Sequence, residues 1–263
     1  IDWMLVLFIL PILGAGLVTM TSFGVEGGLF WRQMIWIGVS FAVFFGLSFF
    51  DFSVLKKTKV IVFVYGFFVA LLIALFFFGS TIKGAQSWFN FGFFSFQPSD
   101  LAKVALILIL AKYFSRRHVE IANVKHVFIS GLYALVPFLL VFLQPDFGTA
   151  MIILLVWFGM VLISGINKKH LLIVVSGGIV VLFLLWTFVF AGYQKARIKS
   201  FLNPLTDIQG TGYNAYQSTI AVGSGQVFGK GVGYGTQSRL QFLPEYETDF
   251  IFAAFSEEWG FVG

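Results

Sequence analysis

Long apolar runs, separated by short polar segments, organise this chain. Seven of them approach the ~20 residues that a helix needs to cross a bilayer. These runs lie at about 3–21, 34–50, 60–79, 99–114, 127–143, 149–165 and 171–192. An eighth begins at about 250, shortly before the last residue, Gly263. Strand-like alternation is absent, so the pattern predicts an all-α polytopic membrane helix bundle with seven full transmembrane helices and the start of an eighth.

The stretch from 193 to 249 is the one long segment without such a run. We therefore expect a single membrane domain with helices one to seven over 1–192 and a long extracytoplasmic loop over 193–249. The start of helix eight follows over 250–263.

The positions of Lys and Arg predict the orientation of the bundle, because short loops rich in these residues stay cytoplasmic. The loops at 51–59, 115–126 and 166–170 carry eight of them: Lys56, Lys57, Lys59, Arg116, Arg117, Lys125, Lys168 and Lys169. The alternate loops carry two, Arg32 and Lys83. The N-terminus is therefore expected in the cytoplasm. The first run has Asp2 in place of a basic flank and no small-residue cleavage site, so we expect no signal peptide.

Composition agrees with a membrane protein and excludes some chemistry. The chain is 59% hydrophobic and 11% charged, whereas soluble domains carry roughly 25% charged residues. It has no Cys, which excludes disulfides, Cys-ligated zinc and thiol catalysis within it. The three histidines, His118, His126 and His170, lie in or beside the cytoplasmic loops, and we expect no role for them at the outer face.

Four charged residues mark the outer starts of predicted helices. Asp100 and Lys103 are spaced i, i+3 at the start of helix four, which places them on one face. Asp146 begins helix six and Asp249 begins helix eight. Each acid alone could be a helix cap, and Lys103 could snorkel to the interface. Because charges at bilayer depth cost at least ~2.5–3.5 kcal/mol each, their gathering at one membrane face favours a functional site.

The outer segment contains a glycine-rich stretch beside many hydrogen-bond donors. Six glycines fall between Gly223 and Gly235. The stretch is not a phosphate loop, because Gly229-Lys230 is followed by Gly231 where Ser or Thr is required. A flexible loop is one interpretation. The other is close approach of the backbone to an anionic, hydroxyl-rich ligand such as a sugar phosphate. The donors that could serve it are Gln217, Ser218, Lys230, Gln237, Ser238 and Arg239.

Acidic residues gather near the end of the chain. Five of the 12 acids lie between Glu245 and Glu258. Glu257 and Glu258 fall about two turns beyond Asp249 along the predicted helix. We expect these two to pair inside the bundle or to mark where helix eight tilts.

Several long motifs carry a family resemblance over nearly the whole chain, in order. They are K-G-A-Q-S-W-F-N-F-G-F-F-S-F-Q-P-S-D-L-A-K at 83–103, Q-P-D-F-G-T-A at 144–150, Y-Q-S-T-I-A-V-G-S-G at 216–225, and G-K-G…G-T-Q-S-R-L-Q-F-L-P-E-Y-E-T-D-F-I-F…E-E-W-G-F-V-G at 229–263. The chain resembles the SEDS family, the RodA and FtsW polymerases of bacterial cell-wall synthesis. Its G-T-Q-S-x-L-x-F-L-P-E run is more similar to RodA than to FtsW.

The resemblance implies ten membrane helices, so this chain would lack the last two and most of the eighth. It implies a peptidoglycan glycosyltransferase that polymerises lipid II into glycan strands at the outer face of the bacterial cytoplasmic membrane, for cell elongation and shape. The implied partner is a class B penicillin-binding protein, which crosslinks the strands. No nucleic acid is implied.

The resemblance also singles out residues. The family's key acid, in its T-D-F motif, corresponds to Asp249. Lys103, Asp146 and Asp100 match its other important polar positions, although Asp100 stands where the family usually has Glu. Departures elsewhere in the pattern are Gln226, where many members have Gly, and Glu247, where His is frequent.

The reaction itself suggests what these residues would do. A sugar 4-hydroxyl attacks an anomeric carbon that carries pyrophosphate, and a single displacement inverts the α bond to β. The step needs a carboxylate base near the hydroxyl and cations or a metal near the departing pyrophosphate. Asp249 is the candidate base, or the ligand of a divalent cation such as Mg²⁺ or Mn²⁺, and the sequence does not separate these roles.

Further residues are candidates for binding substrate or shaping its site. Those for substrate binding are Lys103, Lys230, Arg239, Arg197, Gln217 and Ser218. Asp100 and Asp146 would orient Lys103 or shape a cavity.

Two other classes of function compete with the polymerase interpretation. A lipid II transporter would carry charges at mid-depth and broken helices. A non-catalytic membrane scaffold would tolerate loss of Asp249. Charges at one face beside a long outer loop favour surface chemistry.

Overall fold

The computed structural model describes residues 3–21, 28–82, 84–92, 94–116, 124–165 and 167–263. Arg117, His118 and Lys83, which entered the sequence predictions, lie outside these ranges. The chain forms two compact units, one of residues 1–50 with 190–263 and one of residues 51–189. Each unit is described by itself.

Each of the seven predicted spans forms a helix. They are α1 (Trp3–Thr21), α2 (Gly28–Ser48), α3 (Thr58–Phe78), α4 (Pro98–Ser115), α5 (Val124–Leu143), α6 (Phe147–Ile163) and α7 (Lys168–Leu184). Among the described residues, five segments are long and apolar enough to cross a bilayer, namely α1, α2, α3, 125–143 and 169–189. Helix α6 has 17 residues, and α4 carries Asp100, Lys103 and Lys112.

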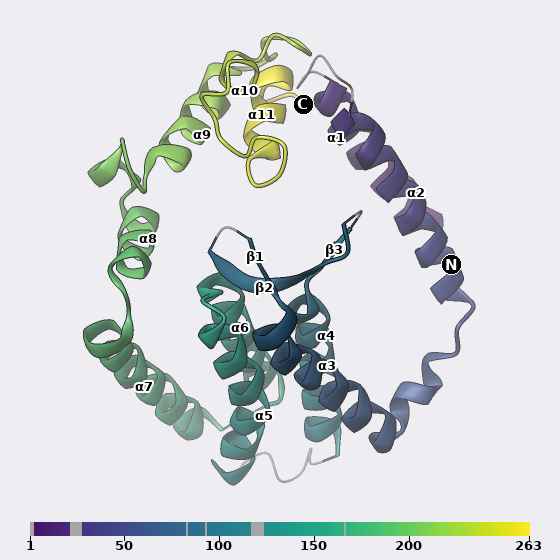
Figure 1. Cartoon of the computed structure of the whole chain (residues 1–263), viewed down its shortest axis with the longest axis vertical. Helices are drawn as coiled ribbons and strands as arrows, with labels where there is room; N and C mark the ends of the chain where they lie inside the picture. Colours follow the sequence, from purple (N-terminus) through teal and green to yellow (C-terminus); the bar gives the residue numbers. More distant parts are fainter. Residues whose placement is uncertain (1–2, 22–27, 83, 93, 117–123, 166) are drawn as a thin grey trace. The chain divides into compact units, whose positions relative to one another are not determined.

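The 51–189 unit is a bundle of α3, α4, α5 and α6 (Figure 1). Fully buried side chains from all four helices form its core: Leu72, Leu75, Leu106, Leu110, Val141 and Ile153. Many other large apolar side chains face outward, including Phe63, Phe77 and Leu155. Exposed apolar surface on this scale is what a lipid environment covers. A short 3-10 helix (Phe52–Lys56) precedes α3, and a π-helical turn (Leu185–Val189) follows α7.

A small antiparallel sheet lies at one end of this bundle and was not predicted from the sequence. Its strands, in the order β1-β2-β3, are Ser80–Ile82, Ala85–Asn90 and Ser95–Phe96. The Gln86 backbone N–H donates to the Gln144 carbonyl (3.2 Å), which ties the sheet to the α5–α6 turn. Because these strands are two to six residues long, they lack the extended alternation that makes a strand legible in sequence.

The other unit combines α1 and α2 with the outer segment and the end of the chain. The segment predicted as a loop contains helices: α8 (Gly192–Leu202), a 3-10 turn (Pro204–Asp207), α9 (Tyr213–Ser224) and α10 (Thr236–Arg239). The predicted start of helix eight is α11 (Ile251–Trp259), which packs against α9 and α1. Figure 1 shows α9, α10 and α11 grouped together.

Candidate active site

Asp249 lies on a turn that is held by backbone hydrogen bonds and by a small apolar cluster. The Thr248 and Phe250 backbone N–H groups both donate to the Glu245 carbonyl at 3.1 Å. Under the turn, fully buried Leu243 packs with Ala221 of α9 and Ala253 of α11. The apolar contacts therefore hold the turn while the Asp249 side chain remains exposed.

The Asp249 carboxylate does not cap α11. The residue at the N-cap of α11 is Phe250, and no side chain there accepts a capping hydrogen bond. Within the described part of the chain, Asp249 makes no hydrogen bond or ion pair. A carboxylate with this exposure is available to a substrate hydroxyl or to a cation.

Asp146 does act as a cap. Its Oδ1 accepts a hydrogen bond from the Thr149 backbone N–H (3.1 Å) at the start of α6. Its Oδ2 accepts a second from the Gln97 side-chain amide (3.1 Å). The two short motifs Q-P-S-D and Q-P-D-F therefore meet, and Asp146 fixes the residue that precedes α4.

Asp100 and Lys103 form the ion pair that their spacing predicts. Lys103 Nζ lies 2.8 Å from Asp100 Oδ1, on the first turns of α4. Helix α4 begins with Pro98 at its first position, where a missing backbone N–H costs nothing. The Asp100 side chain is 60% exposed and that of Lys103 21%. Asp100 therefore orients Lys103, whereas Asp146 binds Gln97.

The other predicted substrate ligands lie in the outer segment. Arg197 on α8 is exposed, with its guanidinium 6.0 Å from the centre of the Tyr193 ring. Arg239 on α10 is also exposed, and Gln217 and Ser218 are half-buried on α9. These side chains share the unit that holds Asp249.

Lys230 has an intramolecular partner. Its Nζ lies 2.6 Å from Glu257 Oε1 and donates to Thr236 Oγ1 at 2.8 Å. Glu257 is fully buried on α11 and Glu258 nearly so. Glu257 therefore has an ion-pair partner, as expected, and this partner belongs to the outer segment.

The glycine-rich stretch packs on α11 and is not a flexible loop. The Lys230 and Gly231 backbone N–H groups donate to the Glu257 and Glu258 carbonyls at 3.0 and 2.9 Å. A Cβ at Gly225 or Gly229 would overlap the carbonyl oxygen of Ser256 or Glu258. These glycines permit close backbone approach, as predicted, and the group approached is α11.

Asp207 organises the turn between α8 and α9. Its Oδ2 accepts hydrogen bonds from the Thr211 backbone N–H (2.8 Å) and hydroxyl (3.0 Å). These bonds, the backbone one first, hold the pKa of Asp207 below its usual value. Its carboxylate is therefore ionised at neutral pH and fixes the direction in which α9 begins.

The sequence profile of the FtsW/RodA/SpoVE family, described as "cell cycle protein", matches residues 3–263. The chain belongs to this family. The predicted resemblance to SEDS proteins is thus confirmed, together with a multi-pass helical membrane fold.

Named relatives within the FtsW/RodA/SpoVE family are similar over long stretches. Peptidoglycan glycosyltransferase MrdB of Escherichia coli is 43% identical over 197 residues, which are 74% of this chain and 52% of MrdB. Stage V sporulation protein E of Bacillus subtilis is 32% identical over 275 residues, covering 100% of this chain and 74% of the relative. The chain spans about half the length of MrdB.

Solved structures of family members share the fold. Rod shape determining protein RodA of Thermus thermophilus has a TM-score of 0.66 at 30% identity, covering 100% of this chain and 68% of that one. A chain from a structure titled for the coordination of polymerization and crosslinking by a peptidoglycan synthase complex has a TM-score of 0.78 at 30% identity. That match covers 100% of this chain and 72% of the other.

In the part of the chain that the structure describes, no group of three or more His, Asp and Glu side chains is arranged to hold a metal ion. Sequence reasoning missed the surroundings of Glu257, in particular Ser224 and Thr236. The available signal was a pair of adjacent acids inside an apolar helix, which must find partners when buried.

Proposed function

We propose that the full-length protein is a peptidoglycan glycosyltransferase that polymerises lipid II for cell elongation and shape. The observation that carries the proposal concerns Asp249, which lies on an anchored turn in the T-D-F motif. Its exposed carboxylate has no partner among the residues that the structure describes. Relatives named peptidoglycan glycosyltransferase support it, with MrdB at 43% identity and an FtsW protein from Tolumonas auensis at 38%.

The proposed reaction is one inverting displacement. The Asp249 carboxylate accepts the proton of a sugar 4-hydroxyl as that oxygen bonds to the anomeric carbon of a second lipid-linked sugar. The bond from this carbon to the pyrophosphate oxygen breaks, and the lipid pyrophosphate leaves with the electron pair. The α linkage of the donor becomes the β linkage of the glycan strand, and Asp249 supplies general-base catalysis.

The departing pyrophosphate carries negative charge that cations would stabilise. Lys103, Arg197 and Arg239 are our candidates, since Lys103 is held by Asp100 and both arginines are exposed. Lys230 was the fourth candidate and is already paired with Glu257. Gln217 and Ser218 remain candidates for binding the sugar. Asp146 is a candidate for shaping the site, because it holds Gln97, the residue before α4.

A divalent cation is compatible with these residues. Mg²⁺ in phosphate chemistry is commonly held by one or two carboxylates together with the substrate's phosphate oxygens. Asp249 would be the protein ligand, and Mg²⁺ or Mn²⁺ would neutralise the pyrophosphate.

We propose the bacterial cytoplasmic membrane as the location, with the N-terminus in the cytoplasm and residues 193–249 outside. The excess of Lys and Arg in alternate loops supports this orientation. We further propose a class B penicillin-binding protein as partner. The similar chain from a peptidoglycan synthase complex, whose title couples polymerization to crosslinking, supports such a partner.

The test is polymerisation of purified lipid II by the full-length protein with its transpeptidase partner. Asp249→Asn removes the base and keeps the shape of the side chain, so we expect a loss of about 10²- to 10⁴-fold in rate. Glu247→Gln, the same kind of change two residues away, is the matched control and should retain activity. Partner binding and thermal unfolding should be unchanged in both variants.

The competing interpretations give different results in this assay. Polymerisation by Asp249→Asn at the wild-type rate would exclude the base, and lipid II translocation in vesicles would then test the transporter. If Asp249→Asn is inactive, measuring Mn²⁺ binding to the wild type and to this variant separates a metal ligand from a base, because loss of a ligand weakens binding of the ion and loss of a base does not.

A further inference from the structure

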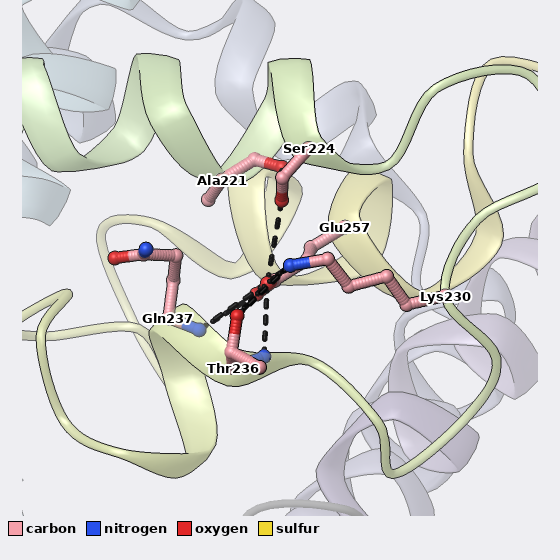
Figure 2. Close-up of polar contacts among 6 residues, drawn as sticks. All are labelled: Ala221, Ser224, Lys230, Thr236, Gln237 and Glu257. Atoms are coloured by element: carbon pink, nitrogen blue, oxygen red, sulfur yellow. Dashed lines mark hydrogen bonds and ion pairs between the residues drawn. The ribbon is translucent and has the colours of Figure 1, made fainter.

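The buried carboxylate of Glu257 joins three separate stretches of chain. Figure 2 shows Ser224, Lys230, Thr236 and Gln237 converging on it. Oε1 accepts from Lys230 Nζ (2.6 Å), the Thr236 backbone N–H (2.9 Å) and its hydroxyl (3.0 Å), and at 3.3 Å from the Ser224 hydroxyl. The Gln237 backbone N–H lies 3.1 Å from Oε2. A fully buried carboxylate held by a cation and backbone amides is strongly bound as the anion.

The backbone around this carboxylate is built for close contact. A Cβ at Gly235 would lie 3.1 Å from Glu257 Oε2, tighter than ordinary van der Waals contact. The Gly233 N–H donates to Glu258 Oε1 at 3.0 Å. Glu257 therefore binds Lys230 and Thr236, near the two ends of the 229–237 segment, and Glu258 binds Gly233 between them. Together they hold the segment against the C-terminal half of α11.

These contacts close the stretch of chain that carries Asp249. Gln237 and Glu257 are hydrogen-bonded, and Asp249 lies between them in the sequence. Within the stretch, the Leu243 N–H donates to the Gln237 carbonyl at 3.0 Å, and Leu243 is fully buried beneath the turn. The stretch that carries Asp249 is thus attached at two places, at Gln237 through the Glu257 carboxylate and just after Asp249 through α11.

We propose that Glu257 is a positioning residue for Asp249 and that Lys230 serves as its charge partner and not as a phosphate ligand. The proposal rests on the proposed function. Two of the three ammonium donors of Lys230 already point at Glu257 and Thr236. Loss of the Glu257 charge weakens the hold on Thr236 and Gln237, while the backbone bonds of Lys230 and Gly231 to α11 remain. The Asp249 turn then loses one of its two attachments.

The first experiment measures lipid II polymerisation by full-length Glu257→Gln, Lys230→Met and the double variant, with Glu247→Gln as matched control. Glu257→Gln removes the charge that pairs with Lys230 and places an amide NH2 group against the Gln237 N–H, so we expect kcat to fall about 10- to 100-fold, the effect of small misplacements. KM for lipid II should stay near the wild-type value. Lys230→Met should lower kcat less, because the backbone donors remain, and the double variant should resemble Glu257→Gln alone.

The second experiment is hydrogen–deuterium exchange of the same proteins, which does not depend on activity. Glu257→Gln should speed exchange in peptides covering 229–239 and leave α5 and α6 unchanged. A variant that destabilises the whole protein would speed exchange everywhere. Should Glu257→Gln fail to fold, Thr236→Val supplies the same test, because it removes the hydroxyl between Lys230 and Glu257 and keeps the backbone N–H.

The outcomes separate this proposal from the proposed function. If wild type does not polymerise lipid II, the proposed function fails, and a positioning role for Glu257 in that reaction fails with it, while local exchange still tests the attachment. Unchanged exchange in Glu257→Gln overturns the attachment whatever the activity. Faster local exchange with normal kcat overturns the positioning role. A raised KM in Lys230→Met with unchanged kcat would overturn the charge-partner role and indicate that Lys230 binds the substrate.

Discussion

Asp146 and Asp249 both precede a helix, yet they do different things. Asp146 is half-buried and bonded to Thr149 and Gln97, so its carboxylate is committed to the protein. Asp249 is exposed and caps nothing. The same residue type before a helix is thus a structural cap in one case and an exposed carboxylate in the other, because the cap geometry depends on the backbone at the N-cap.

Because of this difference, alanine substitutions of Asp146 and Asp249 should change the free energy of unfolding by different amounts. Asp146→Ala should destabilise the protein by about 0.5–2 kcal/mol, the usual cost of losing a capping side chain. Asp249→Ala should leave the free energy of unfolding within about 0.5 kcal/mol. Thermal unfolding in one detergent compares the two variants directly. Equal destabilisation would contradict the assignment of Asp249 as a group without a structural role.

The glycine-rich stretch and α11 form one structural element although they are separate in sequence. Backbone hydrogen bonds from Lys230 and Gly231 reach the last turn of α11, and the Phe261 and Val262 N–H groups donate back to Gln226 and Val227. At Gly225 and Gly229 the two backbones lie closer together than a Cβ would allow. The glycines are therefore required by packing within the protein.

Two glycines in this region should respond differently to alanine. Gly229 has φ +79°, and an added Cβ would overlap the Glu258 carbonyl. Gly229→Ala should therefore cost more than about 1 kcal/mol. Gly223 lies within α9 with nothing near its Cβ position, so Gly223→Ala should be neutral or stabilise by up to about 1 kcal/mol. Unfolding measurements test the pair, and equal values would contradict the packing.

As a whole, the chain is a multi-pass membrane protein of the FtsW/RodA/SpoVE family. Its outer segment carries Asp249, Arg197 and Arg239, while Lys103 and Asp146 belong to the other compact unit. The orientation of the chain in the membrane decides on which side of the membrane the proposed chemistry takes place.

Single cysteines test this orientation, and the chain itself contains none. Tyr234 is 70% exposed in the outer segment, and Lys57 lies in a loop predicted to be cytoplasmic. In intact cells, a membrane-impermeant maleimide should label Tyr234→Cys and not Lys57→Cys, in a full-length protein cleared of other cysteines. The reverse pattern would place residues 193–249 inside and contradict surface chemistry.

The amino-acid sequence by itself determined the seven apolar helices and the family, and it placed Asp100 and Lys103 on one face of a helix. These follow from local pattern, since hydropathy, i, i+3 spacing and contiguous motifs need no long-range contact. Only the tertiary structure decided that Asp146 holds Gln97, that Lys230 binds Glu257, and that the glycine-rich stretch packs on α11. Each of these joins residues 20 or more positions apart, and a buried carboxylate's partner depends on which donors the fold brings to it.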